Sequence, residues 1–463
     1  MEEKKGMSVS VRSFVTAIIV IFVLMVAAYV LTLVSPGGAY VRTPDSNGNL
    51  IIAPDAAFEA VPGGIPFWKW CLSPILVLGA GGSGTLIAVI AFLLIIGGVF
   101  AALEECGLMR YMLDKLTDRF AAVRYKLMAV IMFFFMAMGA MIGSFEECVP
   151  LVPIVVALSV SLGWDALTGV GMSLLAVGCG FASGVCNPFT VGVAQELAGL
   201  PMFSGAGMRL LSFVCIYTLL VFFVRRHAKR VERRESGLEL HFEQNGKLDK
   251  ALAAFGGILG VGIALVLCSG FIPALQDLTM IIVAVMFLAA GIVSVRLAGM
   301  GWKALGRSFW GGLTAIFPAV IMILMSSSIK YTLEEAQVLD TVLHAAVGVA
   351  DTLPRWAVVL FIYLIVLVMN FFIPSGSAKA FMLIPLIVPL AQIFGISAQL
   401  CVLAFAFGDG FSNVLYPTNP ALLISLGLAD VSYPDWFKWS WKFQLPNLLL
   451  TSCLLLLGLA IGY

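Results

Sequence analysis

The sequence predicts an all-α polytopic membrane protein built from two inverted repeats, each with a re-entrant hairpin and a broken helix. Three observations predict this fold class. Of the 463 residues, 61% are hydrophobic and 11% are charged, and the mean hydropathy is +1.04, a composition typical of chains embedded in lipid. Long apolar runs alternate with basic clusters. Interrupted apolar segments recur in both halves of the chain.

The apolar runs set the number of spans and exclude several classes of protein. At about 20 residues per crossing, they predict roughly nine full spans with shorter re-entrant pieces. The basic residues stand at the ends of apolar runs rather than in one patch, so no nucleic-acid partner is indicated. The nine cysteines form no CxxC pair and lie mostly in apolar runs, as small hydrophobic residues do.

The basic clusters predict the orientation, because Lys and Arg flanking short loops stay in the cytoplasm. Basic residues precede the first apolar run at 13–34, follow the run at 84–105, and crowd the segment 225–250. The polar stretch 35–64 holds one basic residue, Arg42. We therefore expect a cytoplasmic N-terminus and an external 35–64 loop.

The first half is predicted to cover residues 1–224. The segment 125–162 starts and ends on the cytoplasmic side, so we expect a re-entrant hairpin with GAMIGSFEECVP at its tip. Irregular backbone at such depth is stable only when it is buried in protein or lines a wet cavity. A broken helix at 166–197, interrupted at GFASGVCNPFT, and an inward helix at 206–224 complete this half.

A cytoplasmic basic linker at 225–250 is predicted to lead into the second half, residues 251–463. Helices near 251–270, 278–296 and 310–330 should alternate across the membrane. A second re-entrant hairpin at 354–394 has FFIPSGSAKAF at its tip, and a broken helix at 399–426 is interrupted at FGDGFSNVLYPTNP. A last helix at 441–462 ends outside.

The two halves match under a constant shift of 232 residues. The matched pairs are Pro153 and Pro385, Gly163 and Gly395, Gly178 and Gly410, Asn187 and Asn419, and Pro188 and Pro420. LEECGLM at 103 also resembles LEEAQVL at 333. An odd number of crossings separates the halves, which predicts inverted repeats whose interrupted helices meet near the midplane, as in many secondary transporters.

Polar side chains gather at the four interruptions. Half-helix N-termini there offer N–H donors to a carboxylate, while half-helix C-termini and freed carbonyls suit a cation. The neutral candidates are Ser144, Ser183, Asn187, Thr190, Ser375, Ser377, Ser412, Asn413, Thr418 and Asn419. The alternative, that these side chains only satisfy backbone exposed by the kinks, stays open.

Four ionisable residues lie within apolar segments, where a charge is costly and usually functional. Glu146, Glu147 and Lys379 are predicted to bind substrate. Asp409, with Ser183 and Ser412, is the candidate sodium site or proton acceptor. Because the shift places Glu147 opposite Lys379, we expect these two side chains to pair in the empty site; a purely structural salt bridge is the alternative.

These motifs also carry a family resemblance. GSFEE, NPF, PSGS, GDGFSN and YPTNP resemble the YfcC-type transporters, relatives of the anaerobic four-carbon dicarboxylate carriers in the ion transporter superfamily. The resemblance implies one substrate site formed by two hairpins and two broken helices, elevator-type movement, and a bacterial inner membrane. Two departures, PTNP in place of PTS and Lys379 two residues after PSGS, leave both dicarboxylates and amino acids as cargo.

The sequence therefore predicts a secondary active transporter of a small amino acid or carboxylate, coupled to sodium or protons as a symporter or exchanger. A four-carbon dicarboxylate carrier and an arginine/ornithine-type antiporter are the alternatives. The expected partners are the small-molecule substrate, the lipid bilayer and a second copy in a homodimer, with no cofactor.

Channel and enzyme functions are disfavoured by particular residues. A pore for water or neutral solutes would avoid charged hairpin tips. FGDG resembles the motif of intramembrane aspartyl proteases, but Ala406 replaces its first glycine and no second aspartate lies in an apolar helix. His227, His241 and His344 lie outside the broken-helix core, which disfavours a membrane serine protease.

Overall fold

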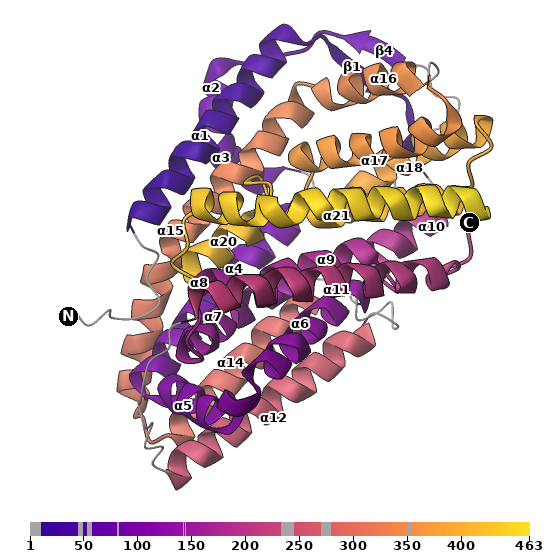
Figure 1. Cartoon of the computed structure of the whole chain (residues 1–463). Coiled ribbons are helices and arrows are strands. Elements are labelled where there is room, and N and C mark those ends of the chain that lie inside the picture. The colour runs from indigo at the N-terminus through magenta and orange to yellow at the C-terminus, as the bar shows by residue number, and fades with distance from the viewer. Residues whose placement is uncertain are drawn as a thin grey trace.

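The computed structural model describes residues 11–44, 50–52, 58–80, 83–141, 143, 145–232, 245–269, 279–350 and 353–463. Within these ranges the chain is mostly helical (Figure 1). The helices of the first half are α1 (Val11–Val34), α2 (Phe67–Cys71), α3 (Ser73–Leu76), α4 (Ser83–Glu105), α5 (Leu108–Phe120), α6 (Arg124–Met141), α7 (Val152–Ser161), α8 (Ala166–Val170), α9 (Ala176–Ser183), α10 (Val193–Leu197) and α11 (Ala206–Val231). Those of the second half are α12 (Gly246–Ser269), α14 (Thr279–Leu297), α15 (Trp302–Glu335), α16 (Val338–Ala350), α17 (Arg355–Phe372), α18 (Gly376–Ile393), α19 (Ala398–Asn413), α20 (Pro420–Leu428) and α21 (Tyr433–Ile461).

Short 3₁₀ and π-helical segments join several of these helices. The 3₁₀ segments are η1 (Val77–Gly79), η2 (Ala121–Val123) and η3 (Glu146–Leu151), and the π segments are η4 (Gly171–Leu175) and η5 (Pro188–Gly192). Nine helical segments of the described chain are long and apolar enough to cross a membrane. The protein is thus a multi-pass membrane protein.

The predicted external loop at 35–64 contains β-structure, which the all-α prediction missed. β1 (Gly37–Tyr40) pairs antiparallel with β4 (Phe58–Val61), and β2 (Arg42–Pro44) pairs with β3 (Leu50–Ile52). Two-stranded ribbons are marginal on their own. The β1–β4 ribbon is held by α16 and the residue before it: the Gly38 N–H donates to the Gln337 carbonyl at 2.9 Å, and the Tyr40 N–H donates to Asp340 of α16 at 3.0 Å.

The two segments predicted as hairpins are each closed at the base by an arginine. Arg124 begins α6 and donates to the Leu162 carbonyl after α7, at 3.2 Å. Arg355 begins α17 and donates to the Gly395 carbonyl after α18, at 2.7 Å. The two ends of each segment therefore lie together, so the chain enters and leaves each segment at one place.

Helix lengths repeat between the halves in the same order. α5 and α16 each have 13 residues, and α6 and α17 each have 18. In each half a helix is then interrupted, between α9 and η5 in the first half and between α19 and α20 in the second. The first interruption begins at Gly184, whose φ of +49° is a left-handed conformation that glycine adopts without strain.

Glycines bring the interrupted helices into direct backbone contact. A Cβ at Gly180 would overlap the Met136 carbonyl of α6, and a Cβ at Gly410 would overlap the backbone of Ala182. α9 therefore packs closely against both α6 and α19. Because α9 and α19 cross just before their interruptions, both interruptions are brought to the same region.

The helices α4, α12, α14 and α15 form a second group, in which α4 packs on α14 and α15 and α12 packs on α14. In Figure 1, α15 runs along one edge of the molecule while α12 and α14 lie beneath α6. A small apolar cavity separates α6 and η3 from α12 and α14; it is lined by Met138, Leu151, Leu259, Ile263, Val283, Met286 and Phe287.

Some helices are longer than predicted. α15 has 34 residues rather than the span 310–330, and α21 starts at Tyr433 rather than near 441. α11 continues to Val231 and α12 begins at Gly246, so both extend into the predicted linker 225–250. Basic and polar residues beyond an apolar run do not end a helix by themselves, because they are good helix formers in water.

Candidate functional site

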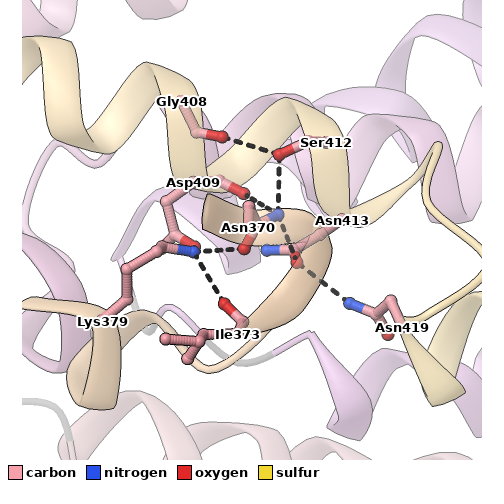
Figure 2. A network of polar contacts seen from close by, with 8 residues as sticks. All are labelled: Asn370, Ile373, Lys379, Gly408, Asp409, Ser412, Asn413 and Asn419. Carbon is pink, nitrogen blue, oxygen red and sulfur yellow. Dashed lines mark hydrogen bonds and ion pairs between the residues drawn. The ribbon is translucent and has the colours of Figure 1, made fainter. Parts of the chain in front are cut away.

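A buried network of charges and amides lies where the second interruption meets the end of α17 (Figure 2). Lys379, in the first turn of α18, and Asp409, on α19, are both fully buried, and Lys379 Nζ lies 2.5 Å from Asp409 Oδ1. Lys379 also donates to the Asn370 side-chain oxygen and to the Ile373 carbonyl at 3.2 Å. The ammonium thus has an acceptor for each of its three protons.

Asn370 connects this ion pair to the interruption of the second half. Its Nδ2 lies 2.6 Å from Ser412 Oγ, 3.1 Å from the Asp409 carbonyl and 3.1 Å from Asn413 Oδ1. Asn419 donates to the same Asn413 oxygen at 3.1 Å. A single amide therefore holds α17 and α19 in register beside the break.

Asn419 also caps the helix that follows the break. Its Oδ1 accepts a hydrogen bond from the Ala421 N–H at 2.9 Å, and Pro420 occupies the first helical position. Both features are typical helix starts. The N-terminus of α20 is consequently fixed next to the charged network.

The first half contributes its own interruption to this region. Asn187 Oδ1 accepts from the Thr190 N–H at 3.1 Å. A Cβ at Gly143 would overlap the Asn187 side chain, and a Cβ at Gly376 would overlap the Thr190 methyl group and lie 2.6 Å from Asp409 Oδ2. Thr190 of the first half is thus next to Gly376 and Asp409 of the second.

Three side-chain oxygens in this region are buried without a hydrogen-bond partner among the described residues. They are Asp409 Oδ2, Thr190 Oγ1 and Thr418 Oγ1. Buried polar atoms are normally paired, so unpaired ones indicate strain or a site for water, an ion or a ligand. Glu146 lies half-buried on η3, and its carboxylate and that of Asp409 carry like charges that repel each other.

The structure brings together much of the predicted residue set. Lys379, Asp409, Ser412, Asn413 and Asn419 form one network, with Thr190 next to it. The Thr418 carbonyl is used elsewhere, because it accepts from Ser326 of α15 at 2.7 Å. Ser144 and the side chain of Glu147 lie outside the described residues.

Of the predicted serines that the structure describes, Ser412 alone belongs to this network, where it accepts from Asn370. Ser183 donates to the Gly180 carbonyl of its own helix at 2.7 Å, and Ser412 donates to the Gly408 carbonyl at 2.6 Å. Ser375 is exposed and Ser377 is half-buried. The described residues contain no group of three or more His, Cys, Asp or Glu side chains placed to hold a metal ion.

The structure shows a partner for Lys379 that was not predicted, Asp409 of its own half. The side chain of Glu147, the predicted partner, lies outside the described residues. The shift of 232 residues relates equivalent positions, and equivalence in a repeat does not place two side chains in contact. Asn370 was missed, although an amide within the apolar run VLVMNFFIP is a signal of the same kind as the charges that were found.

The fold and this site define an integral membrane protein with a buried polar centre at paired helix interruptions, as secondary transporters have. Residues 14–460 match the family described as "DcuC: C4-dicarboxylate anaerobic carrier". The chain belongs to this family of transporters.

Two relatives align over most of the chain. The "Putative basic amino acid antiporter YfcC" of Escherichia coli (strain K12) is 30% identical over 380 residues, which are 77% of this chain and 74% of that protein. An uncharacterized protein of Haemophilus influenzae is 24% identical over 383 residues, 80% of this chain and 74% of that protein. These matches confirm the resemblance seen in the sequence motifs.

Two solved structures are also similar to this chain. The YdaH transporter of Alcanivorax borkumensis has a TM-score of 0.46 and 17% identity, covering 97% of this chain and 99% of that chain. MtrF of Neisseria gonorrhoeae, described with a class of antimetabolite efflux pumps, has a TM-score of 0.43 and 17% identity, covering 96% and 94%.

Proposed function

We propose that this chain is a secondary active transporter of a small amino acid across a bacterial inner membrane. Its family supports the transporter class. Charge favours a cargo that carries an amine. The hairpin tips and breaks hold three acidic residues, Glu146, Glu147 and Asp409, against two basic ones, Lys379 and the buried Arg209 of α11, which donates to the Val185 carbonyl at the first break. A cationic group on the cargo improves this balance.

One observation carries the proposal. Asp409 gives one oxygen to Lys379 and keeps the other, Oδ2, buried without a donor among the described residues. Leaving a buried carboxylate oxygen unpaired costs about 1–3 kcal/mol or more. A cargo ammonium placed between Asp409 and Glu146 would supply that donor and offset the cost.

The carboxylate of the same cargo has a separate place. α20 begins beside the network at Pro420, which has no N–H, and the next N–H, of Ala421, is already bonded to Asn419. An anion would therefore be attracted mainly by the positive end of the helix dipole. Amine and carboxylate would then bind at two distinct points, as a zwitterion requires.

The geometry also supports the predicted movement. Two re-entrant hairpins closed at their bases, together with two crossed broken helices, would move as one bundle against α4, α12, α14 and α15. The seam between them is apolar where Met138 and Leu151 face α12 and α14, so sliding breaks no hydrogen bonds there. Inverted repeats, a cytoplasmic N-terminus, an external C-terminus and a homodimer of the fixed helices belong to this proposal.

Two alternatives have specific support. The description of the family favours a four-carbon dicarboxylate, which would bind to Lys379 and the N-terminus of α20. The name of the E. coli relative favours exchange of basic amino acids, whose second cationic group would suit the acidic tip.

Counterflow in liposomes tests the proposal. Purified protein is reconstituted, loaded with unlabelled alanine, arginine, ornithine or succinate, and supplied with the same labelled compound outside. We expect saturable accumulation of at least one of the amino acids. The variant Glu146→Gln should raise its KM about 30-fold or more, because losing one partner of a buried charge pair typically costs 2–5 kcal/mol.

The matched control is Asp114→Asn, which also removes one acidic group. Asp114 lies on the partly exposed face of α5, and its Oδ2 is 4.0 Å from Arg110 Nε. It should leave KM within about twofold, since exposed pairs contribute little. Counterflow of succinate without any amino acid would replace the proposal by the dicarboxylate alternative. Non-saturable flux without counterflow would indicate a channel.

A further inference from the structure

The ammonium of Lys379 is held as a bound cation would be. Its three acceptors come from three different places: the carboxylate of Asp409 on α19, the amide oxygen of Asn370 on α17, and the main-chain carbonyl of Ile373. Lys379 has no exposed surface. The side chain reaches this position from the first turn of α18. The cation is therefore covalently attached to the protein rather than a free ion.

The acceptor set is the kind that binds hard cations. Carboxylate, amide and carbonyl oxygens are the usual ligands of such ions. Ile373 is the C-terminal cap of α17, and the carbonyls at a helix C-terminus carry the negative end of the helix dipole. In interrupted-helix transporters, such C-terminal ends and freed carbonyls coordinate the coupling ion.

The repeat itself does not require a lysine here. The equivalent position of the first half is Glu147, and the equivalent of Asp409 is Val177. Only the second half therefore has a carboxylate at the break. A buried cation is also present at the first break, where Arg209 of α11 donates to the Val185 carbonyl at 3.3 Å and to the Ser204 carbonyl at 2.9 Å. In the second half the cation and the carboxylate occur together, as expected if the ammonium fills the cation position that the carboxylate creates.

We infer that Lys379 occupies a built cation-binding position and makes this transporter independent of sodium. The ammonium belongs to the protein and cannot cross the membrane with the cargo. Because it occupies the position where a sodium ion would bind, a sodium gradient cannot drive transport through this position. Removing the ammonium opens the position: Asp409 Oδ1, Asn370 Oδ1 and the Ile373 carbonyl would then be free for a sodium ion. This inference concerns the coupling ion and rests on the proposed function only for the transporter class.

Thermal unfolding of the purified protein without any cargo tests it. The wild type should have the same Tm in sodium chloride and in choline chloride of equal ionic strength. Lys379→Ala should be less stable in choline and should gain about 5 °C or more, saturably, at sodium concentrations near 100-fold above Kd, because a ligand that binds only the folded state stabilises it.

Two further variants make the result specific. Lys330→Ala removes a half-buried lysine of α15 that pairs with Glu334 at 3.3 Å, and its Tm should not respond to sodium. The double variant Lys379→Ala, Asp409→Asn also removes the carboxylate charge that Lys379→Ala leaves unpaired. Its Tm should not respond to sodium, because the charged ligand of the ion is gone. A sodium response that survives in the double variant would place the ion elsewhere and overturn the inference.

Measurements on the wild type alone also test the inference if Lys379→Ala fails to fold. Sodium-specific stabilisation of the wild type, or counterflow that requires sodium, would overturn the inference. Equal Tm and equal counterflow in sodium and choline would support it. Because the unfolding measurement contains no cargo, its outcome is independent of whether the cargo is an amino acid.

Discussion

At Gly376 the two halves of the chain approach so closely that a single methyl group has no room. A Cβ there would overlap the Thr190 methyl group of the first half and lie 2.6 Å from Asp409 Oδ2. Gly376→Ala should therefore push Thr190 and Asp409 apart. We expect cargo affinity in the counterflow assay to fall about 10-fold or more, because overpacking typically costs 1–3 kcal/mol.

Gly207→Ala is the control for this substitution. Gly207 also lies in the first turn of a helix, α11, and a Cβ there has nothing within 4 Å. It should leave affinity unchanged and the Tm equal or slightly higher, since alanine favours helix over glycine. Equal effects of the two substitutions would show that helix propensity, not crowding at the site, explains the result.

At the scale of single residues, sequence reasoning found the charges but not their partners. Lys379 and Asp409 could be singled out because ionisable residues in apolar runs are rare. Their contact could not, since it depends on how α18 folds back against α19. Asn370 was missed because one amide inside an apolar helix gives a weak signal, although it contacts both charged residues.

Among the elements, the start of α8 depends on one side chain with two functions. Asp165 is the N-cap and accepts from the Thr168 N–H at 2.8 Å. It also contacts His227 of α11 at 2.9 Å. Burial raises the pKa of the Asp165 carboxyl, but the hydrogen bonds from His227 and Thr168 outweigh burial, so its pKa lies below the ordinary value.

A lowered pKa in the folded state stabilises the fold above the unfolded-state value of about 3.9, and this stability is lost as the pH falls through the folded value. Asp165→Asn keeps a good N-cap and removes the charge. We expect its Tm to lie about 2–4 °C below wild type at pH 7, for a partly exposed pair that contributes up to about 1 kcal/mol.

The same measurement repeated at lower pH checks the sign. The difference between wild type and Asp165→Asn should shrink below about pH 4, where the wild-type carboxyl also becomes neutral. Asp165→Ala should cost about 1 kcal/mol more at every pH, because it also removes the cap. A difference that grows as the pH falls below about 4 would contradict the role given to the carboxylate.

Element boundaries were predictable where apolar runs are long and unpredictable where burial comes from distant partners. The interrupted helices were placed within a few residues. The bounds of the β-ribbon and of α5 could not be predicted in this way, because neither has an apolar run. α5 is fixed to α12 through Lys115 and Tyr111, which both donate to Asp249, and the ribbon is fixed to α16. Both contacts join segments far apart in the sequence.

For the whole molecule, Cys71 reports the orientation. It is exposed on α2, just after the ribbon, on the side predicted to be external. A membrane-impermeant maleimide added to intact cells should label the wild type, and Cys71→Ser should abolish this labelling.

The opposite side needs its own reporter. Asp114→Cys in the Cys71→Ser background places a thiol on α5, within the basic segment predicted to be cytoplasmic. It should react only after the membrane is permeabilised. If Asp114→Cys is labelled in intact cells while Cys71 of the wild type is not, the chain has the opposite orientation to the one predicted.

The repeat duplicates the helices without duplicating their chemistry. At the positions equivalent to Asn370, Asp409, Ser412 and Asn413, the first half has only apolar residues and a glycine, namely Met138, Val177, Gly180 and Phe181. In the inverted arrangement that we propose, equal side chains in both halves would make the site the same from either compartment. Because the charged network lies in the second half alone, the two approaches to the site differ chemically.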